Sequence, residues 1–200
     1  MRGSLVILVF FSIGLLLGFY HIIPDSLIKD EYSSYALYIL MFLVGVGVGA
    51  DSKALLALKS FNLRIFLVPL TTIIGTAIGV SFVYLLIPGL SFKDVQAVGS
   101  GYGYYSLSSI IITETYSKTL GVVALLSNVM REIITLLAAP LIAIYFGKIA
   151  PICSGGATSM DTTLPIITKA SGKEYAIVSL FHGIVLTILV PIIVSLILSL

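Results

Sequence analysis

The feature of this sequence that most restricts its fold is a set of long apolar runs, of which residues 63–87 form the least interrupted. About 20 such residues suffice to cross the hydrocarbon core of a bilayer as an α-helix. Hydrophobic residues make up 58% of the chain and charged residues only 10%, whereas a soluble domain carries about 25% charged residues. We therefore predict an integral membrane protein. It should be all-α, because a helix satisfies its backbone hydrogen bonds without water.

The apolar runs predict five membrane-spanning helices and leave two further segments undecided. The five helices are expected over Leu5–Ile23, Tyr35–Ala50, Leu63–Ile87, Thr119–Phe146 and Tyr175–Leu200. The two glycine-interrupted segments either cross or re-enter the membrane, so we expect five to seven transmembrane helices in one domain, residues 1–200. Positive residues gather on cytoplasmic loops, and both versions place the C-terminus outside. The predicted location is the cytoplasmic membrane, with several passes.

One interrupted segment, Ser154–Pro165, consists mainly of small and hydroxylated residues with one carboxylate, Asp161. Gly155 and Gly156 each cost a helix about 1 kcal/mol relative to alanine, and Pro165 lacks a backbone N–H. Irregular backbone survives inside a bilayer only where protein buries it or water reaches it. We therefore expect a broken helix or a re-entrant loop that lines a polar path. An extramembrane loop with a helix cap is the alternative.

The other interrupted segment, Gly99–Ser109, alternates glycine with small or aromatic residues before a serine-rich stretch. Ser106 or Ser108 is expected to cap the helix that continues to Glu114. A pair of glycine-interrupted hydrophobic segments in one chain is the best sequence indication of a transporter's binding site. We therefore predict that the two segments converge on one polar cavity.

A polar stripe interrupts the predicted helix Thr119–Phe146. At ~1.5 Å per residue, Glu132 lies ~18 Å from the start of this helix, near the bilayer midplane. Each charge there costs ~2.5–3.5 kcal/mol on insertion scales. Arg131 and Glu132 point about 100° apart and each needs a partner elsewhere, whereas Asn128, Glu132 and Thr135 share one face. The stripe predicts a substrate or proton site, with a structural ion pair between two helices as the alternative.

The sequence gives little support to an enzyme or a metal protein. Gly47–Asp51 differs by one residue from the motif of intramembrane aspartyl proteases, and a Ser106–His182 pair lacks a supporting nucleophile motif. No group of histidine, cysteine or carboxylate residues has metal-ligand spacing, so we predict neither a metal nor a cofactor. A cation- or proton-conducting channel and an accessory subunit without its own site remain as alternatives to a transporter.

Three elements of the sequence resemble the LysO-type lysine exporters. They are Gly101–Ser108, the Arg131–Glu132 pair and Gly155–Pro165, which occur in the order and spacing of that family. The resemblance extends over nearly the whole chain, including Phe42–Gly45. It implies export of L-lysine or of a close basic amino acid, driven by proton antiport. It also implies that Glu132 matters for transport.

The sequence departs from that family in three respects. Tyr104 stands where the family often has tryptophan, and Ser109 where it often has glycine. Typical members also begin with an additional block of helices that carries a second important aspartate. The resemblance therefore implies either a small separate membrane chain or a homo-oligomer that supplies this block. Asp51 is a candidate to replace the aspartate, but no motif supports that transfer.

The chemistry of lysine fits the two interrupted segments. Its carboxylate suits helix N-termini and exposed backbone N–H groups, and its ammonium groups suit the desolvated carboxyl groups of Glu132 and Asp161. We predict that Glu132 alternates between a protonated and a substrate-bound state. Arg131 is expected either in an interhelical pair or on the carboxylate of the substrate.

The residues predicted to bind substrate or proton belong to the two interrupted segments or to the polar stripe. They are Glu132, Asp161, Arg131, Asn128, Gly101, Gly103, Tyr104, Tyr105, Ser106, Ser108, Gly155, Gly156, Thr158, Ser159 and Thr162. The secondary candidates are Asp51, Glu114 and His182.

Overall fold

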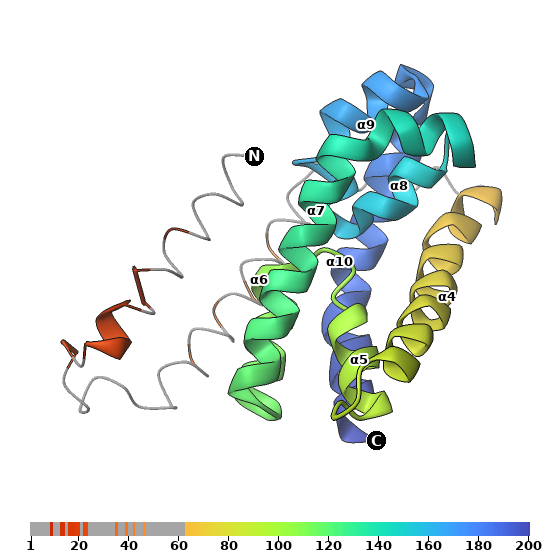
Figure 1. Ribbon diagram of the computed structural model, residues 1–200. Coiled ribbons are helices and arrows are strands. Elements are labelled where there is room, and N and C mark those ends of the chain that lie inside the picture. Colours follow the sequence, from red (N-terminus) through yellow and green to blue (C-terminus); the bar gives the residue numbers. More distant parts are fainter. Residues whose placement is uncertain are drawn as a thin grey trace.

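The computed structural model describes residues 63–200 and, before them, residues 9, 13–14, 16–20, 22–23, 35, 39, 42 and 46 (Figure 1). The predicted spans Leu5–Ile23 and Tyr35–Ala50 lie largely outside the described residues, and Asp51 lies wholly outside them. These parts of the sequence analysis stay predictions. The elements described below all belong to residues 63–200.

Three long apolar helices run from one end of the described part to the other (Figure 1). They are α4 (Leu63–Leu86), α7 (Lys118–Phe146) and α10 (Ala176–Ser199). Each is long and apolar enough to cross a membrane, and each begins and ends within a residue or two of its predicted span. The prediction of an all-helical protein with membrane-spanning helices is therefore confirmed for this part of the chain.

Both glycine-interrupted segments form pairs of short helices that lie between α7 and α10 and contact both of them. The first pair is α5 (Phe92–Gly99) and α6 (Tyr105–Thr115). In Figure 1 it enters from the lower end of the molecule, turns near the middle and returns to the lower end.

The second interrupted segment enters from the opposite, upper end (Figure 1). It consists of α8 (Ala150–Gly155), a five-residue 3₁₀-helix η2 (Gly156–Met160) and α9 (Leu164–Ser171). A shorter 3₁₀ turn, η3 (Lys173–Tyr175), then leads into α10. The predicted breaks are thus present in both segments, and the two helix pairs point toward each other from opposite ends.

Left-handed backbone conformations produce the two breaks. After α5, Tyr102 has φ 44° and Gly103 has φ 87°, and after α8, Gly156 has φ 64°. A right-handed helix cannot continue through such residues, and glycine adopts them at the lowest cost. The positive φ of Tyr102 is uncommon for a side chain of its size.

The predicted helix cap in the first segment is wrong. Helix α6 begins at Tyr105, and its N-cap residue, Tyr104, makes no side-chain capping bond. Ser106 and Ser108 therefore lie inside the helix, where a serine cannot accept from the first free N–H groups. The Ser108 hydroxyl instead donates to the Tyr104 carbonyl, four residues earlier, at 2.9 Å.

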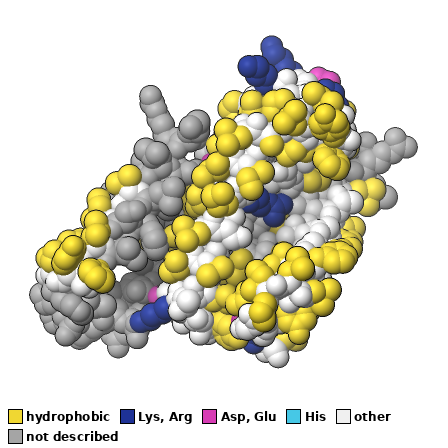
Figure 2. Space-filling model, viewed as in Figure 1, with side chains coloured by type: hydrophobic (Ala, Val, Ile, Leu, Met, Phe, Trp, Pro, Cys, Tyr) yellow, Lys and Arg dark blue, Asp and Glu magenta, His cyan; other side chains and the backbone are white. Residues whose placement is uncertain are grey.

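The outer surface of the described part is largely apolar, with basic side chains at its upper end and others near the middle and the lower end (Figure 2). On α7, Leu137 is 76% exposed and Ile144 is 73% exposed, as expected of residues that face lipid. Lys148, Lys169 and Lys173 follow or end elements that reach the upper end in Figure 1. The buried core instead lies where the first break and α6 pack on α7 and α10.

Candidate functional site

The two interrupted segments meet near the middle of the molecule. The Ala157 N–H of η2 donates to the Tyr102 carbonyl in the first break at 2.8 Å. Glycine is needed on both sides of this contact: a Cβ on Gly156 would lie 2.0 Å from the Tyr102 oxygen, and one on Gly103 would lie 3.0 Å from the Gly155 oxygen. Their convergence, predicted from sequence, is therefore present as direct backbone contact.

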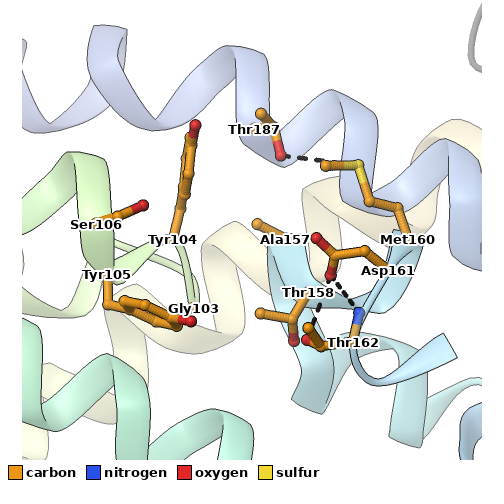
Figure 3. A pocket seen from close by; sticks show the side chains of 10 residues that line it. All are labelled: Gly103, Tyr104, Tyr105, Ser106, Ala157, Thr158, Met160, Asp161, Thr162 and Thr187. Atoms are coloured by element: carbon orange, nitrogen blue, oxygen red, sulfur yellow. Dashed lines mark hydrogen bonds between the residues drawn. The ribbon is translucent and has the colours of Figure 1, made fainter. Parts of the chain in front are cut away.

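A cavity of about 290 Å³ opens beside this contact (Figure 3). Its walls come from the first break, the start of α6, η2 with the loop after it, and α10. The residues that line it are Gly103, Tyr104, Tyr105, Ser106, Ala157, Thr158, Met160, Asp161, Thr162 and Thr187. The lining is mostly apolar or uncharged, and Asp161 is the one carboxylate among these ten residues.

Asp161 directs a carboxylate oxygen into the cavity. Its Oδ1 accepts from the Thr162 backbone N–H and, at 3.3 Å, from the Thr162 hydroxyl. The other oxygen points toward the space between Tyr104 and Ala157 (Figure 3). Local hydrogen bonds thus orient this carboxylate, and one of its oxygens remains available to a cation.

The start of α6 faces Asp161 across the cavity (Figure 3). The first N–H groups of an α-helix have no acceptor within the helix, and the N-cap residue Tyr104 supplies none from its side chain. The helix dipole adds a partial positive charge at this end. The cavity therefore has a wall that favours an anion opposite a carboxylate that favours a cation.

The polar stripe of α7 contacts both breaks. Asn128 accepts the Gly103 N–H at its Oδ1, at 2.8 Å, and donates from Nδ2 to the Val98 carbonyl at 3.1 Å. Asn128 thereby satisfies one backbone group before the first break and one within it. Gly101 leaves room for this side chain, because a Cβ there would lie 2.5 Å from Nδ2.

Arg131 makes the equivalent contact with the second break. Its Nε donates to the Ser154 carbonyl at 2.9 Å and its Nη2 to the Cys153 carbonyl at 2.8 Å. Thr135, one turn later, contacts the Ser154 hydroxyl at 2.7 Å. A cation suits the C-terminal end of α8, where carbonyl groups lack helical partners. Among the described residues Arg131 thus connects two helices through backbone carbonyls, and contact with a substrate carboxylate stays a prediction.

Glu132 lies on α7 between the residues that contact the two breaks. Its side chain is 0% exposed, and neither carboxylate oxygen has a hydrogen-bond partner within the described part of the chain. It does not line the cavity. A buried carboxylate without a partner is costly while it is charged.

The structure brings some of the predicted residues to the cavity wall and leaves others behind it. Seven of them line the cavity: Gly103, Tyr104, Tyr105, Ser106, Thr158, Asp161 and Thr162. Gly101, Ser108, Gly155, Gly156 and Ser159 are buried in or beside the breaks without lining it. Glu114 lies at the far end of α6, and His182 is buried on α10.

Three lining residues were not predicted: Ala157, Met160 and Thr187. Ala157 and Met160 carry no polar side-chain group and gave no signal of their own. Thr187 is a hydroxylated residue inside the very apolar helix α10, one turn after Gly183. That combination could have indicated a helix face directed at something polar.

Long apolar helices with two interrupted segments that meet at one cavity are typical of multi-pass membrane transporters. A family model described as "Lysine exporter LysO" matches residues 8–198. The chain therefore belongs to the LysO family of lysine exporters, as its sequence motifs predicted. It is a multi-pass protein of the cell membrane, in a family of transporters and not of enzymes.

Two curated relatives support this assignment. "Lysine exporter LysO" of Escherichia coli (strain K12) is 32% identical over 166 residues, which cover 82% of this chain and 54% of that relative. "Putative lysine exporter" of Haemophilus influenzae (strain ATCC 51907 / DSM 11121 / KW20 / Rd) is 34% identical over 161 residues, or 78% of this chain and 79% of the relative. The chain thus spans about half the length of the E. coli protein. No solved structure matches it.

Proposed function

We propose that this chain acts in the export of L-lysine, or of a close basic amino acid, across the cell membrane as a proton-driven secondary transporter. The observation that carries the proposal is the family match over residues 8–198. The cavity supports it independently, because its two faces suit the two kinds of charge that an amino acid presents. A metal or cofactor has no role in the proposal.

Lysine binds in the cavity with its carboxylate at the start of α6. The positive end of the helix dipole at that first turn, beside Tyr105 and Ser106, suits a carboxylate. Asp161 then receives an ammonium group of the substrate on its free oxygen, in a charge-assisted hydrogen bond. The apolar residues between these two ends suit the methylene groups of lysine.

Glu132 carries the coupling proton. Burying a carboxyl group with no described partner costs less when the group is neutral than when it is charged, and a positive charge bound nearby favours the charged form. Binding of a cationic substrate at Asp161 is therefore linked to binding of a proton at Glu132. The predicted direct contact between Glu132 and lysine requires Glu132 to become accessible in another conformation.

The arrangement of the helices favours five spans with two re-entrant segments over seven spans. In Figure 1 each interrupted segment returns to the end from which it entered. The end at which Lys148, Lys169 and Lys173 lie is then cytoplasmic, in agreement with the positive-inside rule. The two re-entrant segments approach the cavity from opposite sides of the membrane, as alternating access to one site requires.

Efflux of radiolabelled lysine from proteoliposomes tests the proposed function. The purified protein should give saturable efflux that increases when the outside is more acidic than the inside, and unlabelled lysine outside should drive counterflow. A current or flux that rises linearly with lysine concentration would indicate a channel instead. Absence of lysine flux, with full incorporation of the protein, would contradict the proposal for this chain by itself.

A further inference from the structure

Helix α10 forms the platform on which η2 lies. Ser159 and Ser179 exchange two hydrogen bonds, from the Ser159 hydroxyl to the Ser179 carbonyl at 3.0 Å and from the Ser179 hydroxyl to the Ser159 carbonyl at 2.7 Å. At Gly183 the two backbones approach so closely that a Cβ would lie 2.6 Å from the Met160 Cβ. The position of η2 is therefore set by one face of α10.

His182 on this face connects three elements. Its Nδ1 lies 3.0 Å from the Ser159 hydroxyl of η2, and its Nε2 lies 2.9 Å from the Thr72 hydroxyl of α4. A neutral imidazole donates from one nitrogen and accepts at the other, and hydroxyl groups do both. Because the Ser159 hydroxyl donates to the Ser179 carbonyl, both contacts are hydrogen bonds when Nδ1–H donates to the Ser159 oxygen and Nε2 accepts from the Thr72 hydroxyl. The side chain is 0% exposed, so water does not compete for them.

We propose that His182 is a positioning residue for the binding site, and that its Nδ1 contact with Ser159 fixes the place of Asp161. This inference rests on the proposed function, since it assigns Asp161 to the substrate. Ser159 precedes Asp161 by two residues in a 3₁₀ turn. Such turns have poorer hydrogen-bond geometry than α-helices and depend more on outside contacts.

The two ring nitrogens have different roles in this arrangement. The Nδ1 contact acts on η2, a short element that ends at the cavity, whereas the Nε2 contact acts on α4, a helix of 24 residues. When the histidine is changed, the Thr72 hydroxyl can donate to the Val68 carbonyl and the Ser159 hydroxyl to the Ser179 carbonyl, so the two contacts differ in the length of the element that each one holds. Loss of the Nδ1 contact should therefore weaken lysine binding more than loss of the Nε2 contact.

Two substitutions separate these roles. In His182→Asn the amide group occupies the position of Nδ1 and keeps the contact with Ser159. In His182→Gln the longer side chain places its amide at the position of Nε2 and keeps only the contact with Thr72. We expect the KM for lysine to rise about tenfold in His182→Gln and to change less than about threefold in His182→Asn, with a smaller change in kcat for both.

Ser159→Ala tests the same contact from its other side. It should raise KM at least as much as His182→Gln, because it also removes the hydrogen bond to the Ser179 carbonyl. The double variant should be no worse than Ser159→Ala alone, because both changes remove the contact between His182 and Ser159. Thr72→Val should leave KM near that of the wild type. Thr115→Val is its matched control, since the Thr115 hydroxyl also donates to a carbonyl four residues earlier, that of Ile111, but is far from the cavity.

The rate of thiol labelling in the cavity wall tests the role of His182 without lysine. With Cys153→Ser as background, Thr162→Cys places a thiol in the cavity wall beside Asp161. His182→Gln should change its rate of reaction with a small thiol reagent by about threefold or more, and His182→Asn should not. If wild type shows no lysine transport, the proposed function fails, while this labelling still decides the role of His182. Equal KM values and equal labelling rates in the two histidine variants would overturn the inference, as would additive effects of Ser159→Ala and His182→Gln.

Discussion

Helix α7 carries three polar residues at membrane depth, and their hydrogen-bond partners differ. They are Asn128, Arg131 and Glu132. Asn128 and Arg131 bond to backbone groups of the two breaks, at 2.8–3.1 Å. Glu132 is fully buried and has no hydrogen-bond partner among the described residues. Hydrogen bonds offset the cost of burying a polar side chain and so explain the burial of Asn128 and Arg131. No such bond among the described residues explains the burial of Glu132. Its retention is explained by the proposed role in proton coupling.

Glu132→Gln should remove proton coupling while the protein still folds. The amide cannot gain or lose a proton, so acid-driven lysine efflux should fall to background and lose its pH dependence. Thermal melting in detergent should stay close to that of the wild type, because no described contact is lost. Export that is unchanged and still coupled to protons would refute the assignment of Glu132.

Asn128→Ala, in contrast, should lower the stability of the protein, and transport should fall only because less of the protein is folded. It leaves the buried Gly103 N–H without its acceptor, which costs about 1–3 kcal/mol, whereas the Val98 carbonyl keeps the Gly101 N–H at 3.3 Å. Thermal melting should therefore show clear destabilisation, with lysine transport reduced in proportion to the folded fraction. If Asn128→Ala melted like the wild type, the contact between α7 and the first break would carry little of the stability that we assign to it.

At the scale of elements, the breaks depend on glycine. Gly156→Ala should be destabilising by roughly 1–3 kcal/mol from its left-handed backbone alone, with a further cost because the added Cβ would lie 2.0 Å from the Tyr102 oxygen. Gly79→Ala in α4 is the matched control, since no atom lies within 4 Å of its added Cβ. That change should be neutral or stabilising by up to about 1 kcal/mol. Equal melting temperatures for the two variants would contradict the close contact of the breaks.

The elements that the sequence predicted well are those that depend on local composition. The long helices follow from uninterrupted apolar runs, and the breaks follow from Gly101, Gly103, Gly155 and Gly156. The start of α6 was missed because Tyr104 ends the break without a capping side chain, a pattern with no sequence signal. The backbone bond from Ala157 to Tyr102 could not be predicted either, because it depends on how distant segments pack.

The candidate site was predicted only in part for the same reason. Asp161, Tyr104 and Thr158 were assigned to it from the composition of the breaks, and they do line the cavity. Glu132 was assigned from its depth in the membrane, yet the direction of its side chain depends on the rotation of α7 against its neighbours. The depth of a residue in the membrane follows from counting residues along its helix. The side of a buried helix that faces the cavity does not follow from the sequence when polar residues occur on more than one side.

At the scale of the whole molecule, the two interrupted segments enter from opposite ends and meet at their tips (Figure 1). Lys118 begins α7 and Lys148 follows it, so these two residues mark the two sides of the membrane. With re-entrant segments, Lys118 is outside and Lys148 is cytoplasmic, and with seven spans the two exchange sides.

Labelling of single cysteines distinguishes the two topologies. In a Cys153→Ser background, an impermeant thiol reagent added to intact cells should label Lys118→Cys and should not label Lys148→Cys until the cells are opened. The reverse pattern would show that both interrupted segments cross the membrane and would refute the re-entrant arrangement.

The central claim is that the cavity between the two breaks binds lysine through Asp161. Equilibrium binding of radiolabelled lysine to the purified protein tests it most directly, with Asp161→Asn as the variant and Glu174→Gln, an acidic residue of η3 outside the cavity, as the control. We predict saturable binding by the wild type and by Glu174→Gln, and affinity at least about tenfold weaker in Asp161→Asn. Equal affinity in Asp161→Asn and the wild type would contradict the account.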